Sequence, residues 1–212
     1  MKKIIVIWLV IFAFVMSNVE SKAQCTNCVV PWVCHQFNIS VGSCQGILVT
    51  MCVYCDLSSN KTRIQIIEIF GICSGISEDD VWDAANSHIW SNIEPYCGNQ
   101  PCVGQSISTV YITHPVCGDR SWDGTKLKIS ENRVSCDLRC TKVYEWCYCD
   151  CDPTNCWHDD CRYIYVGVKV FTETDDPFLT GNGVCPKHEK EAIGQDAWTE
   201  YCVKIYECER DK

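Results

Sequence analysis

Six side chains of the kind that bind soft metals stand close together in the second half of the chain: Cys147, Cys149, Cys151, Cys156, His158 and Cys161. Thiolates at alternate positions of a strand project to the same side, where they could converge on one ion such as zinc. The same alternation suits cross-strand disulfides, and a metal requires reduced thiolates. We expect structural disulfides here, with a metal-binding protein centred on Cys147–Cys161 as one alternative.

Two further cysteine pairs have the Cys-x-x-Cys spacing of a redox motif, Cys25 with Cys28 and Cys52 with Cys55. A redox pair normally lies between a strand and the N-terminus of a helix, where the helix dipole lowers the thiol pKa. Cys25 lies beside the predicted leader, and Cys52 falls inside a strand-like run. Neither pair has the setting that thiol exchange needs, so disulfides are expected.

Catalytic signatures are missing from the sequence. None of the five histidines falls in a His-Glu-x-x-His motif, and no Gly-x-Ser-x-Gly motif occurs. We therefore expect no cofactor and favour a disulfide-stabilised binding or interaction protein over an enzyme. A secreted hydrolase whose catalytic groups converge from distant positions is the second alternative.

Aromatic residues alternate along two strand-like segments, residues 140–149 and 162–171. If these strands pair, one face of the sheet carries five rings, which are the candidate binding residues: Tyr144, Trp146, Tyr148, Tyr163 and Tyr165. The Val, Ile and Cys side chains of the other face would then pack on a helix. The aromatic face has two possible fates, packing on the first half of the chain or binding a protein or glycan.

One helix is predicted from Glu78 to Ile93, with Ser77 as N-cap and apolar residues at a spacing of four. A weaker helix follows Pro186, with a buried face made by Ala192, Ile193, Ala197 and Trp198. Strands are predicted at 46–54, 63–72, 140–149 and 162–171, and the first two are apolar on both faces.

The N-terminus has the layout of a secretory signal peptide over residues 1–23. Lys2 and Lys3 precede an apolar run that is too short to span a bilayer. No later stretch is predicted to span a membrane, so the mature chain is expected to be secreted or periplasmic. The formal net charge of −9 argues against nucleic acid as a partner.

The 20 cysteines among 212 residues indicate a disulfide scaffold. Seven of them recur in one order in each half, which predicts an internal repeat with units at 24–103 and 104–212 and a Cys-rich insertion at about 150–161. The fold class expected is α+β, with two similar small units, each a short antiparallel sheet with one helix. An odd number of cysteines in each half predicts at least one bridge between the halves.

Overall fold

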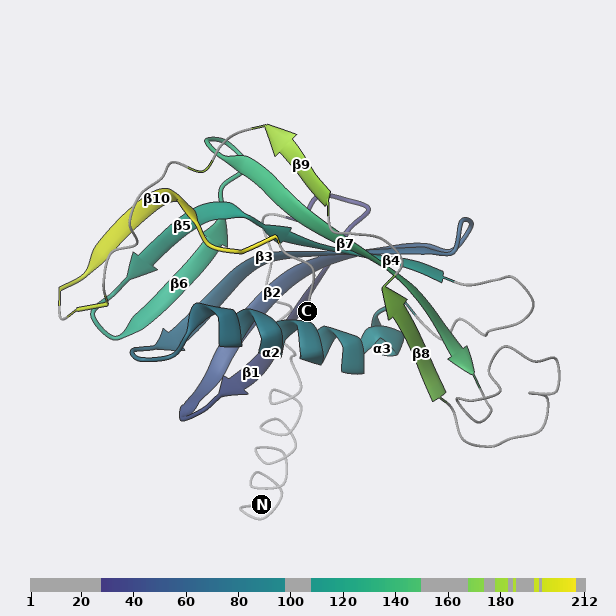
Figure 1. The fold of residues 1–212 in the computed structure, drawn as a ribbon, viewed down its shortest axis with the longest axis horizontal. Helices are drawn as coiled ribbons and strands as arrows, with labels where there is room; N and C mark the ends of the chain where they lie inside the picture. The colour runs from purple at the N-terminus through teal and green to yellow at the C-terminus, as the bar shows by residue number, and fades with distance from the viewer. Residues whose placement is uncertain are drawn as a thin grey trace, which may run out of the picture.

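The computed structural model describes residues 28–97, 108–149, 168–173, 178–182, 185, 193–194 and 196–208, with the backbone alone at 94–95, 146–149, 168–173, 178 and 182. Its helices are α2 (Glu78–Ser91) and the short α3 (Ile93–Cys97). Its strands, shown in Figure 1, are β1 (Val33–Val41), β2 (Cys44–Asp56), β3 (Lys61–Cys73), β4 (Ser108–Pro115), β5 (Cys117–Trp122), β6 (Lys126–Glu131), β7 (Asp137–Cys149), β8 (Val168–Glu173), β9 (Phe178–Asn182) and β10 (Trp198–Lys204). The predicted leader and the insertion at about 150–161 lie outside these residues and stay predictions.

All of these strands belong to one sheet, which branches at β3. One edge of β3 pairs with β2. The other edge is divided, because residues 61–65 pair with β4 and residues 68–73 pair with β6. The sheet continues from there in two branches. One branch contains β4, β7 and β8, with β9 also on β7, and the other contains β6, β5 and β10.

The connection from β3 to β4 explains why the sheet is mixed. These two strands are parallel, whereas the other described pairs are antiparallel. Parallel neighbours need a crossover connection, and α2 lies in that connection. The disulfide-rich class with sheet and helix is confirmed. The two small antiparallel units are not seen in the described part of the chain, because one larger mixed sheet stands there instead. The predicted boundary at 103/104 falls outside it.

The predicted helix at 78–93 is confirmed as α2, which ends two residues earlier, at Ser91. Its acidic first turn lies at the positive end of the helix dipole, as the sequence suggests. Ser77 stands at the N-cap position, but its side chain makes no capping hydrogen bond. The buried face is the one that the spacing predicts: Val81, Trp82, Ala85 and Ile89.

The predicted second helix is wrong over its C-terminal part. Trp198 begins strand β10, which pairs with β5, and neither Ile193, Gly194 nor Ala197 is helical. The start of that helix, after Pro186, is outside the described residues. Backbone pairing with β5 and the disulfide at Cys202 hold β10 in place. Local helix propensity takes account of neither interaction, so it predicts the wrong structure for this segment.

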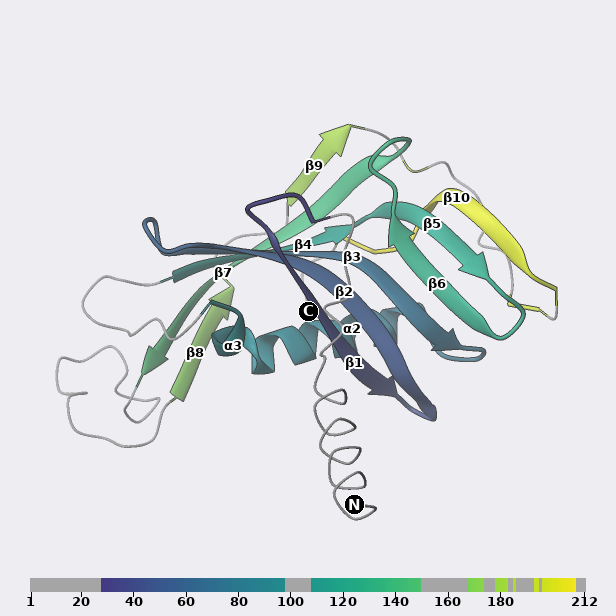
Figure 2. The same cartoon turned by 180° about the vertical axis from the view of Figure 1, so that it is seen from behind.

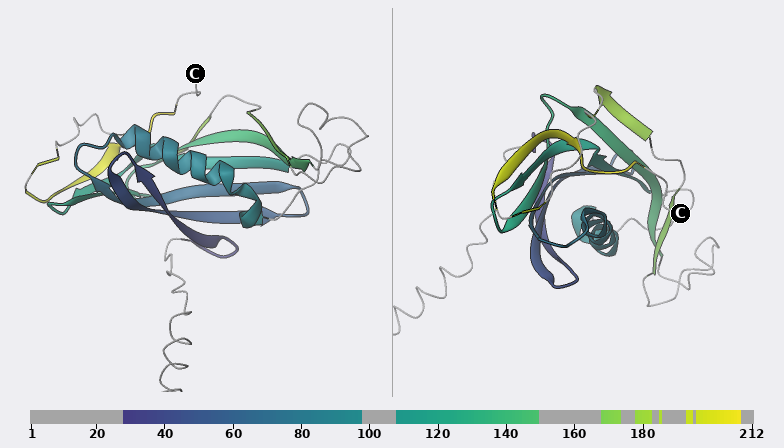
Figure 3. Two further views of the ribbon diagram at one scale, coloured as in Figure 1. Left: turned by 90° about the horizontal axis from the view of Figure 1, so that it is seen from below. Right: turned by 60° about the vertical axis from the view of Figure 1, so that its left-hand side comes forward.

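The sheet curves around α2, which lies against its concave face (Figure 3). Isoleucines of β3, among them Ile64, Ile66 and Ile69, are fully buried in the core. Figure 2 shows the opposite face of the sheet. Residues 49–53 of β2 are buried on both faces, as predicted for a strand covered on both sides.

Six disulfides have both partners in the described part of the chain, with Cα atoms 5.4 to 5.6 Å apart: Cys28–Cys52, Cys44–Cys73, Cys55–Cys97, Cys117–Cys185, Cys136–Cys202 and Cys140–Cys208. No free cysteine occurs among the side chains that the structure describes. These bridges fit an oxidising environment. Neither described helix is long and apolar enough to cross a membrane.

The pairing of these cysteines does not follow the predicted repeat. Cys44–Cys73 would correspond to Cys136–Cys185, but Cys136 bonds to Cys202 and Cys185 bonds to Cys117. Three bridges lie before residue 98 and three lie after residue 116. The predicted bridge between the halves is therefore not among these six and stays a prediction.

Buried polar contacts join α2 to the second half of the chain. The Trp82 indole donates a hydrogen bond to the Ile205 carbonyl, 2.9 Å away. Arg120 of β5 has a side chain only 3% exposed, and its guanidinium pairs with Glu78 of α2 at 2.7 Å and with Glu200 of β10. The helix is thus tied to both strands by one buried cation.

His114 of β4 lies in the same interface. Its ring stacks on Tyr206 with centroids 4.2 Å apart, and Nε2 lies 2.7 Å from Oδ1 of Asn86 on α2. Burial, with a smaller contribution from the Lys142 charge, lowers the pKa of His114 to about 3. The ring is therefore neutral over most of the pH range.

We predict that Arg120→Ala lowers the free energy of unfolding by about 3–5 kcal/mol, because two largely buried carboxylates lose their pairing with a buried cation. Lys128→Ala is the matched control. The Lys128–Glu68 pair is partly exposed, with side chains 39% and 29% accessible, so its loss should cost about 1 kcal/mol or less. Urea denaturation of both variants measures the difference, and similar losses would contradict the buried role of Arg120.

We also predict that His114 makes the fold acid-sensitive. The unfolded chain takes up a proton on this residue below its ordinary pKa of 6.5, but the folded chain does not until about pH 3. Stability from the neutral ring is present above pH 6.5 and declines as the pH falls, by up to about 1.4 kcal/mol per pH unit. Denaturation curves of His114→Phe between about pH 7 and 5 should show a shallower decline. An unchanged slope would refute this.

Candidate functional site

The structure places only part of the predicted aromatic face. The predicted pairing of its two strands is found where β7 meets β8. Tyr144 is 5% exposed, and its ring meets the Trp90 ring of α2 at 4.4 Å. The Tyr144 ring therefore packs on α2. The expectation that the helix would contact only the Val, Ile and Cys face of the sheet is wrong at this position. The side chains of Trp146 and Tyr148, and the whole of Tyr163 and Tyr165, lie outside the described residues, so binding by this face stays a prediction.

The predicted metal cluster also lies largely outside the described residues. Within them, no group of three or more His, Cys, Asp or Glu side chains could hold a metal ion. The Cys52-x-x-Cys55 pair does not close on itself, because Cys52 bonds to Cys28 and Cys55 bonds to Cys97. This arrangement agrees with structural disulfides at this motif.

A hollow of about 660 Å³ lies beside the end of β6 and the middle of β10, and it is the candidate functional site. Arg120 points toward α2, so its neighbour Asp119 points to the other face of the sheet. The hollow is therefore on the face away from the helix. It is lined by Val29, Asp119, Glu131, Asn132, Arg133, Val134, Ser135 and Tyr201.

A β-bulge in β10 forms one wall of the hollow. Glu200 pairs with Arg120 and Val203 pairs with Gly118, so Tyr201 and Cys202 together stand opposite Asp119. Cys202 has a φ of 54°, a left-handed conformation that non-glycine residues rarely adopt. The bulge re-aims Tyr201, whose side chain lines the hollow.

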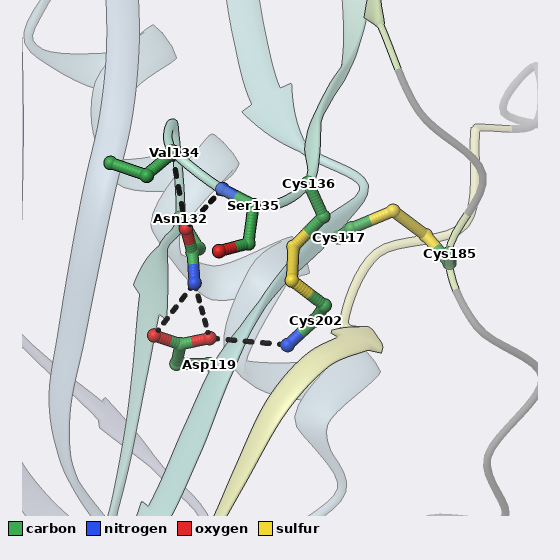
Figure 4. The surroundings of a disulfide bond; sticks show 8 residues. All are labelled: Cys117, Asp119, Asn132, Val134, Ser135, Cys136, Cys185 and Cys202. Carbon is green, nitrogen blue, oxygen red and sulfur yellow. Dashed lines mark hydrogen bonds between the residues drawn. A yellow bond between two sulfur atoms is a disulfide. The ribbon is translucent and has the colours of Figure 1, made fainter.

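Asp119 and the disulfide Cys136–Cys202 hold this bulge in place (Figure 4). The Asp119 carboxylate accepts a hydrogen bond from the Cys202 backbone N–H at 3.1 Å and from Asn132 Nδ2 at 2.9 Å. The Cys117–Cys185 bridge stands nearby. The Cys136–Cys202 disulfide and the Asp119 carboxylate therefore both hold Cys202, the residue with the left-handed backbone conformation.

Asn132 extends this network into the turn between β6 and β7. Its Oδ1 accepts hydrogen bonds from the backbone N–H groups of Val134, at 3.2 Å, and Ser135, at 2.9 Å. One amide side chain thus connects Asp119 to the turn that carries Arg133 and Val134. The turn is built before any ligand binds.

Glu131 is the buried charge of the hollow, with a side chain only 5% exposed. Oε2 accepts a hydrogen bond from Gln65 Nε2 at 2.8 Å. Oε1 forms an ion pair with Arg133, whose Nε lies 2.7 Å away. Burial raises the pKa of Glu131 above its ordinary value despite the opposing effect of Arg133.

Apolar side chains form the rim. Val29, Val134 and Tyr201 are 69%, 97% and 67% exposed, and all three line the hollow. Few large apolar side chains in the described part of the chain are this exposed, and three of those few lie around the hollow.

Sequence reasoning missed this site. The turn composition of Asn132 to Ser135 is a detectable signal. The bulge at Tyr201 is not, because it depends on pairing between distant strands. Comparisons with protein-family models, with curated proteins and with solved structures find no match.

We predict that Glu131→Gln stabilises the unliganded fold at about pH 7. A raised pKa means that the ionised carboxylate costs stability in the folded state, and glutamine keeps the acceptor for Gln65 without that charge. The gain should vanish near pH 4, where the carboxyl is protonated in both states.

Urea denaturation at both pH values tests this. Glu68→Gln, on a more exposed ion pair, is the control and should change little. A loss of stability in Glu131→Gln at neutral pH would show that the charge serves the fold instead.

Proposed function

We propose that the chain is a secreted or periplasmic, disulfide-stapled binding protein that recognises its ligand in the hollow beside β10. The rim is the single observation that carries this proposal. Val29, Val134 and Tyr201 expose apolar surface around a concave site, and exposed apolar patches usually serve recognition. The leader predicted at 1–23 and the disulfides support the proposed location.

Preorganisation is a second support. The φ of Cys202, the Cys136–Cys202 bridge and the Asp119 carboxylate fix the wall that presents Tyr201. A rigid wall reduces the entropy that binding would otherwise lose. Strained residues are also concentrated at functional sites.

Recognition fits the hollow better than hydrolysis. The Asp119 carboxylate is engaged by Asn132 and Cys202, so it orients backbone rather than a catalytic base. Two histidines that could serve as a base pack elsewhere, His114 on Tyr206 and His88 on Phe37. The aromatic strand face remains a separate binding prediction, although Tyr144 is covered by α2.

An NMR screen with a fragment library tests the proposal without knowledge of the natural ligand. We expect shift changes concentrated in the amides of residues 131–135 and 199–203. Tyr201→Ser should abolish them, because it removes the largest apolar surface of the rim. Leu57→Ser is the matched control, since Leu57 is equally exposed but does not line the hollow.

Two results would contradict the proposal. One is shift changes that map to other parts of the molecule. The other is equal binding by wild-type protein and Tyr201→Ser.

A further inference from the structure

We infer that two copies of this chain associate edge to edge through strand β1, so that their sheets join across a two-fold axis. β1 is the last strand on its side of the sheet (Figure 2), and among the described residues it pairs only with β2. Its backbone N–H and C=O groups on the side away from β2 can therefore take up a further strand. Addition of a strand to such an edge is a common mode of protein association.

Charged residues are almost absent from this end of the sheet. The chain has 18 Lys and Arg residues and 27 Asp and Glu residues, yet the only one of them in β1 and β2 is Asp56, the last residue of β2. Charged residues are depleted at the centre of protein interfaces, whereas they are common on a free surface. Strands this poor in charge are therefore suited to contact with protein.

Edge strands that remain free usually carry a device against pairing, such as a lysine, a proline or a bulge. β10, the edge strand at the other end of the strand order, has two of these devices, Lys204 and the bulge at Tyr201. β1 has none from Val33 to Ile39, where it contains no lysine or proline and pairs with β2 in an unbroken register. β1 is thus the unprotected edge of the two.

The side chains on the helix side of β1 form a symmetric, mostly apolar row. Phe37 is the middle residue of the strand and packs against α2. A two-fold axis at Phe37 places the two copies of this ring next to each other. In the same register Val33 lies opposite Val41 of the partner subunit, and His35 lies opposite Ile39 of the partner subunit. Burial lowers the pKa of His35, so this row carries no charge at neutral pH.

The side chains on the outer side of β1 match one another as well. Gln36, Asn38 and Ser40 are exposed and uncharged. The same two-fold axis places Gln36 opposite Asn38 of the partner subunit, where two amides can exchange hydrogen bonds. Directly opposite residues of an antiparallel pair have their side chains on one face of the sheet, and this register meets that condition at every position.

The strand is therefore complementary to itself along its whole length. One register matches apolar residues on the helix side and amides on the outer side, and it brings no like charges together. A different protein, or another segment of this chain, would gain nothing from that symmetry. A second copy is the occupant that the observations favour.

Two double variants of β1 test the pairing. Gln36→Lys with Asn38→Lys places lysines directly opposite each other on both sides of the axis, so we expect the dimer to weaken at least about tenfold. Gln36→Lys with Asn38→Glu places opposite charges there, so the dimer should be kept. Both variants lose the hydrogen bond from Gln36 to Thr50, and that loss cannot explain a difference between them. Sedimentation equilibrium at several protein concentrations measures the dissociation constants.

Ser121→Lys with Thr199→Lys is the matched control. These two residues also lie directly opposite each other, but within one chain, where β5 pairs with β10. The control adds the same charge as the Lys–Lys variant of β1 and should dimerise like the wild type. Urea denaturation of each variant confirms that it is folded.

Hydrogen exchange locates the contact. The β1 amides that point away from β2 should exchange quickly in dilute, monomeric protein and slowly at concentrations where the dimer forms. Slow exchange of all β1 amides in the monomer would mean that another segment of the same chain covers this edge, and it would overturn the inference.

Three further results would also overturn it. A wild-type chain that stays monomeric up to about 1 mM would show that the edge does not take a second copy. Equal dissociation constants for the wild type and the Lys–Lys variant of β1 would move the contact to another surface. Equal weakening by both double variants would contradict the register centred on Phe37. The hollow takes no part in this pairing, so none of these results bears on the proposed function.

Discussion

One edge of β3 is divided between two partner strands, β4 and β6, and the arrangement of the other strands and of α2 depends on this division. β4 takes residues 61–65 and β6 takes residues 68–73, so α2 must cross from β3 to a parallel neighbour and lie in the concavity. Gln65 is the last residue paired with β4 and donates its side-chain hydrogen bond to Glu131, which ends β6. The buried carboxylate of the hollow is therefore anchored at the point where the sheet divides.

Covalent and non-covalent forces act over different ranges in this molecule. The disulfides with both partners described connect residues within 28–97 or residues within 108–208. Contacts between those two regions come from strand pairing at β3 and from the buried side chains under α2. Arg120, His114 and Trp82 each bring a polar group into that interface and find a partner there. The six described bridges each act within one region, and strand pairing and buried contacts join the two regions.

The helices and strands that depend on short-range sequence patterns can be predicted from the sequence. The helix at 78–93 follows from apolar spacing, and strands β2, β3 and β7 follow from long runs of β-forming residues. Strand pairing was predictable where alternation was clear, as for β7 with β8. Local patterns fail where distant partners decide the outcome: Trp198 joins a strand because β5 and Cys136 hold its neighbours, and Tyr201 reaches the hollow because of a bulge. The site could not be derived for the same reason, since its lining comes from four separate places in the chain.

The bulge at Tyr201 has a consequence for biogenesis. Cys202 meets a partner 66 residues earlier, and Cys208 meets one 68 residues earlier. A polypeptide translocated N-terminus first would present Asp119 and the Asn132 turn to its surroundings well before β10 emerges. Until then the wall that Tyr201 forms is missing from the hollow. Under the proposed function, a ligand would be bound only by chains in which β10 has been made and Cys202 has bonded to Cys136.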